Sequence, residues 1–241
     1  MSLQFIIGSS GAGKSYFTYK RIIQESLQHP EKNYYVIVPE QFTMQTQKDM
    51  IRISPGHGIM NVDVQSFVRL AFRVFSETGA GNVQILDDLG KIMILKKVLS
   101  NKKDDLKYFG RNINKDGYIS EIKSFMSELI QYGADENEIE KMIQASENKT
   151  VLKYKLQDMS VAFSAFKEYI DKNYITSEEL LSVFADVISQ SGLLKGAVIC
   201  LDGFTGFTPL QYRLLRELIK IAEKVYITVT ADERESVINK G

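Results

Sequence analysis

The residues with the most definite chemistry lie near the start of the chain. Residues 8–15 read Gly-Ser-Ser-Gly-Ala-Gly-Lys-Ser and fit the pattern G-x-x-x-x-G-K-[ST] at every fixed position. Glycines in such a loop let successive backbone N–H groups turn toward an anion, and the following helix N-terminus adds partial positive charge. We expect Lys14 to reach the outer phosphates of a nucleoside triphosphate and the Ser15 hydroxyl to bind Mg²⁺. The expected nucleotide-binding residues are Gly8, Ser9, Ser10, Gly11, Ala12, Gly13, Lys14, Ser15 and Tyr16.

The segments on either side of this loop have the types that the pattern requires. The apolar residues 3–7 predict a buried strand, and residues 16–28, which contain no Gly or Pro, predict a helix. A second apolar run, residues 34–38, predicts the next strand, so the unit is βαβ and its sheet parallel. The alternative is a Gly/Ser loop that only turns the chain.

A second candidate Mg²⁺ ligand lies near the C-terminal end of the sequence. The apolar run 197–201 ends in Asp202, as in a Walker B strand, which places one carboxylate beside the phosphate loop. We therefore expect Ser15 and Asp202 to hold Mg²⁺ together. Many P-loop ATPases have a Glu directly after this Asp, but here the position is Gly203. The sequence thus favours nucleotide binding over fast hydrolysis, with Gln41 or Gln211 as the candidate for positioning water.

The middle of the chain has a different pattern of apolar residues. From residue 85 to about residue 194 there is almost no strand signal, and amphipathic patterns predict helices at 85–100, 118–132, 135–146, 151–173 and 176–189. The fold class predicted is therefore α/β: a P-loop NTPase with a parallel, RecA-like sheet and a large inserted α-helical subdomain. The predicted boundaries are residues 1–83 and 195–241 for the NTPase domain and residues 84–194 for the insert.

Composition narrows the setting of the protein. Of 241 residues, 44% are hydrophobic and 25% are charged, which is typical of a globular protein. The 30 basic residues balance 30 acidic ones, so the net charge does not indicate nucleic-acid binding. The single cysteine, Cys200, fits a reducing cytoplasm and is expected to be a packed thiol. No apolar run approaches 18 residues, so no membrane partner is expected. His57 has no second ligand at metal spacing and is expected to be a loop residue.

Three further segments carry a resemblance to a known family. They are residues 38–43 (Val-Pro-Glu-Gln-Phe-Thr), residues 65–71 (Gln-Ser-Phe-Val-Arg-Leu-Ala) and residues 201–211 (Leu-Asp-Gly-Phe-Thr-Gly-Phe-Thr-Pro-Leu-Gln). With the phosphate loop, they resemble the N-terminal region of the AddB family, the B subunits of bacterial AddAB (RexAB-type) helicase–nucleases. More distantly, the chain is similar to UvrD-like superfamily-one helicases. The replacement of Asp-Glu by Asp-Gly-Phe is itself an AddB-like departure.

The resemblance implies an ATP-binding, helicase-like module that acts on DNA ends in double-strand break repair by recombination. It implies ATP and Mg²⁺ as cofactors, an A-type helicase–nuclease subunit as heterodimer partner, and single-stranded DNA held by sugar–phosphate contacts. Weak or no unwinding is expected of this chain alone, and any ATPase activity is expected to be slow. AddB-like proteins are much longer, with a second helicase-like half and an iron–sulfur nuclease domain, so the chain resembles their N-terminal piece. The glutamine that reads adenine in many relatives has no counterpart before Gly8.

The loops around residues 41–45 and 65–69 are the expected DNA-contacting region, with Phe42 and Phe67 as base-stacking candidates. The full candidate set is Gln41, Phe42, Thr43, Ser66, Phe67 and Arg69. Core packing of both aromatics, helix capping by Thr43 and a solvated face for Arg69 are the alternatives. The catalytic candidates are Lys14, Asp202 and Gln41. Two other functions stay open: a P-loop kinase or other small-molecule phosphotransferase, and a scaffold whose loop is only structural.

Overall fold

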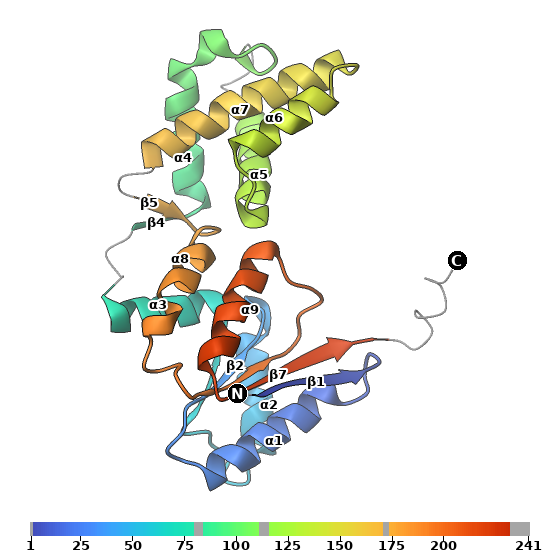
Figure 1. The fold of residues 1–241 in the computed structure, drawn as a ribbon, viewed down its shortest axis with the longest axis vertical. Helices are drawn as coiled ribbons and strands as arrows, with labels where there is room; N and C mark the ends of the chain where they lie inside the picture. Colours follow the sequence, from blue (N-terminus) through green and yellow to red (C-terminus); the bar gives the residue numbers. More distant parts are fainter. Residues whose placement is uncertain (1, 80–83, 111–115, 171–173, 232–241) are drawn as a thin grey trace. The chain divides into compact units, whose positions relative to one another are not determined.

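The computed structural model (Figure 1) describes residues 2–79, 84–110, 116–170 and 174–231. The chain forms two compact units. The first contains residues 1–81, 183–207 and 211–241, and the second contains residues 82–182 and 208–210. The division into an NTPase domain and an inserted subdomain with the boundaries given above stays a prediction.

The first unit is built on a five-stranded sheet in which all pairs are parallel. Its strands are β1 (Ser2–Gly8), β2 (Tyr34–Ile37), β3 (Val62–Gln65), β6 (Val198–Leu201) and β7 (Lys224–Thr230), in the order β1-β7-β6-β2-β3. The central strands β2 and β6 are buried along their whole length, because apolar residues cover both faces of a parallel sheet. The predicted α/β architecture with a parallel sheet is therefore confirmed.

The sequence also predicts helices at residues 45–53, 68–77 and 210–223, and the helices of the first unit begin close to the predicted positions. These helices are α1 (Lys14–Gln28), α2 (Thr43–Ile53), α3 (Phe67–Thr78) and most of α9 (Pro209–Ile221). Tyr19 and Ile22 of α1 and Met50 of α2 join a core with β2, β3, β6 and β7 on one face of the sheet. Ser66, a residue type that favours the N-cap position, caps α3 by accepting from the Arg69 N–H at 3.4 Å. Cys200 is fully buried in β6, and burial raises the pKa of its thiol.

One prediction about the sheet is wrong. The sequence predicts a buried strand at residues 3–7, but Leu3, Phe5 and Ile7 are 41%, 56% and 66% exposed. The reason is the strand order: β1 is at the edge of the sheet, with β7 as its one neighbour among the described strands (Figure 1). An apolar run predicts a strand, but the sequence alone does not show whether other elements cover both of its faces.

The second unit is mainly helical. Its helices are α4 (Asp88–Asn101), α5 (Asp116–Tyr132), α6 (Glu136–Ala145), α7 (Thr150–Ile170) and the start of α8 (Leu180–Val187). The apolar faces of α4, α5, α6 and α7 form one core around Leu99, Phe109, Ile119 and Phe166. Gly133 ends α5 in the left-handed conformation, with φ 70°, as its position predicted. Residues 171–173 of the predicted fourth helical segment lie outside the described residues.

The expectation of almost no strand in this region is wrong at two places. β4 (Gln84–Leu86) and β5 (Tyr174–Thr176) form a two-stranded parallel sheet. Strands of three residues are too short to show an alternating pattern. Thr176 followed three residues later by Glu179 is the pattern of a capping box. The capping box is present, since Glu179 N donates to Thr176 Oγ1 (3.2 Å) and Thr176 N donates to Glu179 Oε2 (2.9 Å).

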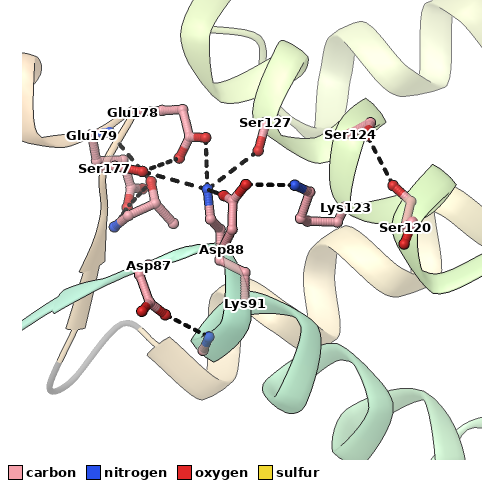
Figure 2. Close-up of polar contacts among 12 residues, drawn as sticks. Asp87, Asp88, Lys91, Ser120, Lys123, Ser124, Ser127, Ser177, Glu178 and Glu179 are labelled. Carbon is pink, nitrogen blue, oxygen red and sulfur yellow. Dashed lines mark hydrogen bonds and ion pairs between the residues drawn. The ribbon is translucent and has the colours of Figure 1, made fainter. Parts of the chain in front are cut away.

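A buried lysine links several elements of the second unit. Lys91 is 3% exposed, and its Nζ lies 2.8 Å from both Asp88 Oδ1 and Glu178 Oε1 (Figure 2). It also donates to hydroxyls of Ser127 and Ser177 at 3.4 Å. The ammonium thus ties α4 to α5 and to the segment before α8, and its charge is balanced by the two carboxylates.

Among the residues that the structure describes, no helix combines the length and the apolar character needed to cross a membrane.

Candidate nucleotide site

The phosphate-binding pattern forms a tight loop between β1 and α1. Gly11 and Gly13 adopt the left-handed conformation, with φ of 76° and 81°. Side chains other than glycine are strained at such angles, which explains two of the pattern's glycines. Gly13 occupies the N-cap position of α1 without a side-chain cap, so the first N–H groups of that helix face the loop without competition from a capping oxygen. This is the arrangement of an anion site at a helix N-terminus.

Lys14 lies across this loop. Its Nζ donates to the carbonyl oxygens of Gly8 at 3.0 Å and Ser9 at 2.7 Å. A Cβ at Gly8 would meet the Lys14 stem at 3.4 Å, so glycine gives the lysine close access to the loop backbone. A phosphate in the loop would compete with these two carbonyls for the ammonium group.

Asp202 is brought to the loop by the order of the strands. It follows β6, its N–H donates to Ile37 O at 3.0 Å, and the residue is 5% exposed. Ser15 Oγ donates to Asp202 Oδ1 at 3.0 Å, although the two residues are 187 positions apart in the sequence. The structure therefore brings together the two side chains that the sequence assigned to one Mg²⁺ ion.

Two further hydroxyls point at the same carboxylate. Thr228 Oγ1, from β7, donates to Asp202 Oδ1 at 2.5 Å, and the Tyr19 hydroxyl, from α1, donates to Asp202 Oδ2. Tyr19 OH also lies 3.5 Å from Thr46 Oγ1 of α2. Burial, together with the negative charge of Asp202, raises the pKa of the Tyr19 phenol well above its usual range, so it stays a donor. Asp202 is thus a buried carboxylate held by three hydroxyl donors.

Sequence reasoning missed Tyr19 and Thr228. Tyr19 lies one turn after Ser15 on α1, a spacing that puts both side chains on one face of the helix. Thr228 becomes a neighbour of Asp202 because Leu201 pairs with Ile227 in the β6–β7 ladder. The first relationship could have been found from helical spacing, whereas the second requires the strand order.

The position after Asp202 offers no carboxylate. Gly203 has φ 76°, and a Cβ there would lie 3.6 Å from both Phe42 and Pro39. Gln41, the candidate for positioning water, is exposed in the short 3₁₀ turn Glu40–Phe42. Tyr16, at the start of α1, is 58% exposed.

The loops after β2 and β3 are joined through Glu40. Its carboxylate accepts from Ser66 Oγ and from Arg69, whose Nε and Nη2 lie at 2.9 and 2.8 Å from Oε1. The sequence suggested a phosphate contact or a solvated charge for Arg69 and gave no sign of this carboxylate partner. Thr43 does not cap α2: it is the first helical residue and donates to Glu40 O at 2.9 Å, while Phe42 holds the N-cap position.

The two base-stacking candidates differ in exposure. Phe67 is 5% exposed, and its ring lies 5.4 Å from that of Phe204, centroid to centroid. Core packing therefore describes Phe67 in this structure. Phe42 is 46% exposed and lies in the turn that follows β2. Of the six DNA-contact candidates, Thr43, Ser66 and Phe67 are buried, and Gln41, Phe42 and Arg69 are exposed.

The donor set suits a magnesium ion that is shared with phosphate. Within the described ranges, no group of three or more His, Cys, Asp or Glu side chains could hold a metal ion by itself. Mg²⁺ in phosphate-processing sites is bound by one or two carboxylates, substrate phosphates and water. Asp202 and Ser15, beside the glycine-rich loop, could provide that partial set.

These features define a class: an α/β protein with a parallel sheet, a glycine-rich loop after the edge strand β1 and a buried carboxylate after β6. The family model described as "ADDB, N-terminal" matches residues 5–240. The chain therefore belongs to the AddB N-terminal family, as the sequence resemblance predicted.

Three similar relatives are each named as the B subunit of an ATP-dependent helicase/deoxyribonuclease. The one from Lachnoclostridium phytofermentans is 49% identical over 98% of this chain. Those from Clostridium novyi and Clostridium tetani are 37% and 36% identical over 96% and 95% of it. In each case the chain spans only 20% of the relative's length.

Proposed function

We propose that the first unit is a P-loop NTPase domain of RecA-like fold that binds ATP with Mg²⁺. The observation that carries this proposal is the 3.0 Å hydrogen bond between Ser15 and the buried Asp202, beside a loop with two left-handed glycines. The names of the relatives, which include "ATP-dependent", support ATP as the nucleotide.

Each residue has a defined role in this proposal. Backbone N–H groups of residues 9–16 bind phosphate oxygens, and Lys14 exchanges the carbonyls of Gly8 and Ser9 for the outer phosphates. Ser15 and Asp202 hold Mg²⁺, with Tyr19 and Thr228 fixing the carboxylate. A bound Mg²⁺ would supply charge neutralisation for the phosphates.

Hydrolysis is proposed to be slow. A fast ATPase needs a group that orients or deprotonates the attacking water, and Gly203 supplies none. Gln41 remains the proposed water-positioning residue, but its exposed position gives it little preorganisation.

Nucleotide binding is tested by comparing Lys14→Ala with Lys20→Ala. Both changes remove one lysine charge from α1, but Lys20 is exposed and outside the loop. A charge-assisted contact to phosphate is worth about 1.5–3 kcal/mol, so Lys14→Ala should weaken binding of a fluorescent ATP analogue by roughly 10- to 150-fold. Lys20→Ala should leave it unchanged. Equal affinities of wild type and Lys14→Ala would refute the site.

At the level of the whole polypeptide, we propose a helicase-like module of an AddB-type helicase–nuclease subunit. Its partners would be an A-type subunit and single-stranded DNA, and its role the processing of DNA ends during recombinational repair in the cytoplasm. The support is family membership and the name that the relatives share, which describes one subunit of a helicase/deoxyribonuclease. Unwinding by this chain alone is not expected.

DNA contact is tested at Phe42, with Met44 as the matched control. Met44 is also exposed, at 67%, and follows two residues later. Stacking of a base on an aromatic ring is worth about 1–3 kcal/mol, so Phe42→Ala should weaken single-stranded DNA binding by roughly 5- to 150-fold. Met44→Ala should have little effect, and affinity should fall with salt. Absence of salt-dependent binding would contradict the DNA proposal without affecting the nucleotide site.

A further inference from the structure

A groove on the second unit lies between α5 and α6 and contains none of the residues of the candidate nucleotide site. Its volume is about 220 Å³, and its lining residues are Phe125, Glu128, Leu129, Tyr132, Ala134 and Met142. Tyr132 and Met142 are 60% and 41% exposed. We refer to these six residues as the α5–α6 groove. A hollow that groups exposed apolar side chains is where a protein surface accepts an apolar group of a partner.

The floor of the groove is part of the core, so its shape is fixed before any partner binds. Leu129 is 5% exposed and belongs to the core of the second unit, and Phe125 and Ala134 pack against that core. The turn between the helices is held by Ala134 N, which donates to Leu129 O at 2.8 Å, and by Gly133 N, which donates to Ile130 O at 3.0 Å. A preformed groove loses little conformational entropy when it binds.

The spacing of the lining residues fits a helix as the bound element. Phe125, Leu129 and Tyr132 are at positions i, i+4 and i+7 of α5, so they follow one face of that helix. Met142 reaches the groove from α6. The apolar face of an amphipathic helix packs into a groove of this kind, which has a helix on each side.

The sequence around the groove carries only negative charge over a long stretch. Between Lys123 and Lys141 there is no lysine or arginine, but there are five carboxylates, at Glu128, Asp135, Glu136, Glu138 and Glu140. All five residues are exposed. The carboxylate of Glu128, which lines the groove, has no hydrogen-bond or ion-pair partner within the described part of the chain. Such a rim attracts a basic partner and repels the phosphates of DNA.

We propose that the α5–α6 groove binds a basic amphipathic helix of a separate protein. Its apolar residues would cover Tyr132 and Met142, and its lysines or arginines would lie beside Glu128 and the carboxylates of α6. A separate protein is favoured because the groove is small and has a charged rim, whereas permanent interfaces are larger and more apolar. This inference depends neither on nucleotide binding nor on DNA binding by the first unit.

A synthetic helical peptide tests the proposal. It has leucines at i, i+3, i+4 and i+7 and lysines on both sides of that stripe, and it is titrated into the 241-residue chain and into the full-length polypeptide. In nuclear magnetic resonance spectra, the methyl signal of Met142 should shift, whereas that of Met93, which is 65% exposed on α4, should not. A peptide with glutamates in place of the lysines should bind at least roughly 10-fold more weakly at low salt.

Two variants test the apolar contact and the rim. Met142→Ala should weaken peptide binding by roughly 3- to 8-fold, because a methionine that is 41% exposed has about that share of its burial free energy still to gain. Met93→Ala is the matched control and should leave the affinity unchanged. Glu128→Lys should weaken binding by roughly 2- to 5-fold at low salt and much less at high salt. Asp104→Lys makes the same charge change at an exposed residue outside the groove and should have a smaller effect.

Several results would overturn the proposal. One is the absence of peptide binding, or binding that leaves the Met142 signal unchanged. Equal affinities for the lysine and glutamate peptides would show that charge does not select the partner. Binding by the 241-residue chain but not by the full-length polypeptide would show that the rest of the polypeptide covers the groove. Self-association of the 241-residue chain that Met142→Ala abolishes would identify a second copy as the occupant.

Discussion

Replacing Tyr19 by Phe tests whether the buried carboxylate of Asp202 depends on its hydroxyl donors. Tyr19 and Asp202 are each 5% exposed, and the phenol donates to Asp202 Oδ2 while Ser15 and Thr228 donate to Oδ1. The change leaves the ring and its packing in place and removes one donor from one carboxylate oxygen. Because water has little access to Asp202, the lost hydrogen bond is not replaced.

The magnitude follows from the charge of the acceptor. A hydrogen bond to a charged group contributes about 1.5–3 kcal/mol to the free energy of unfolding. For a chain of this size each kcal/mol shifts the melting temperature by about 2–4 °C, so Tyr19→Phe should lower it by roughly 3–12 °C. The matched control is Tyr34→Phe, because Tyr34 is 2% exposed and its hydroxyl donates to a neutral acceptor, Glu25 O, at 3.0 Å. That change should cost about 0.5–1.5 kcal/mol.

The assay is differential scanning calorimetry of the two variants, supported by hydrogen exchange of the Asp202 amide, which bonds to Ile37 O. Tyr19→Phe should be more destabilising than Tyr34→Phe and should speed exchange of that amide. If the two variants melt at the same temperature, or if Tyr19→Phe melts at a higher temperature than wild type, Asp202 does not depend on the Tyr19 hydroxyl.

Three further predictions concern the helical unit. Lys91→Met leaves Glu178 without its buried cation and should lower the free energy of unfolding by about 3–5 kcal/mol in urea titrations. Hydrogen bonds from Lys123 and Lys91 lower the pKa of Asp88 from 3.8 to about 2. Burial raises the pKa of Glu178, but the hydrogen bond from Lys91 opposes this effect, and the net result is a pKa below the usual 4.5. Because folding lowers both pKa values, the ionised carboxylates stabilise the helical unit above pH 4.5, and this stabilisation is lost as they are protonated. Helicity measured by circular dichroism should therefore fall as the pH drops toward 2, and constant helicity would contradict the stabilising role of the two carboxylates. Asp158→Ala should cost more than about 2 kcal/mol, because Asp158 accepts three backbone N–H bonds and is 1% exposed; a smaller loss in urea unfolding would refute its anchoring role.

The parts of the fold that could be predicted are those fixed by local chemistry. The glycine pattern predicted the loop, the residue types on either side predicted β1 and α1, and the parallel-sheet rule predicted that Asp202 would approach Ser15. Ser66 as a cap and Gly133 as a helix end also follow from single residues and their neighbours. The roles of these side chains in binding nucleotide stay predictions.

The parts that could not be predicted depend on partners from distant segments. Nothing within residues 3–7 indicates that β1 is an edge strand, because that depends on where β7 inserts. The same holds for Glu40, whose partners Ser66 and Arg69 come from the N-terminal end of α3. The three-residue strand β4 forms only because β5 lies beside it, although the two strands are far apart in the sequence.

The missing carboxylate after Asp202 is a property of the backbone as well as of one residue. Gly203 has φ 76°, and an L-residue at this angle is strained by about 1–2 kcal/mol, so a Glu could not enter without a cost or a change in loop path. Space is not the obstacle, because the nearest atoms, from Phe42 and Pro39, would be 3.6 Å from a Cβ. The left-handed turn also leads the chain from Asp202 toward Phe204, which packs on Phe67 of α3. The conformation that disfavours a general base here therefore also joins the β6 loop to the α3 segment, so the proposed slow turnover and the packing of this loop have one structural origin.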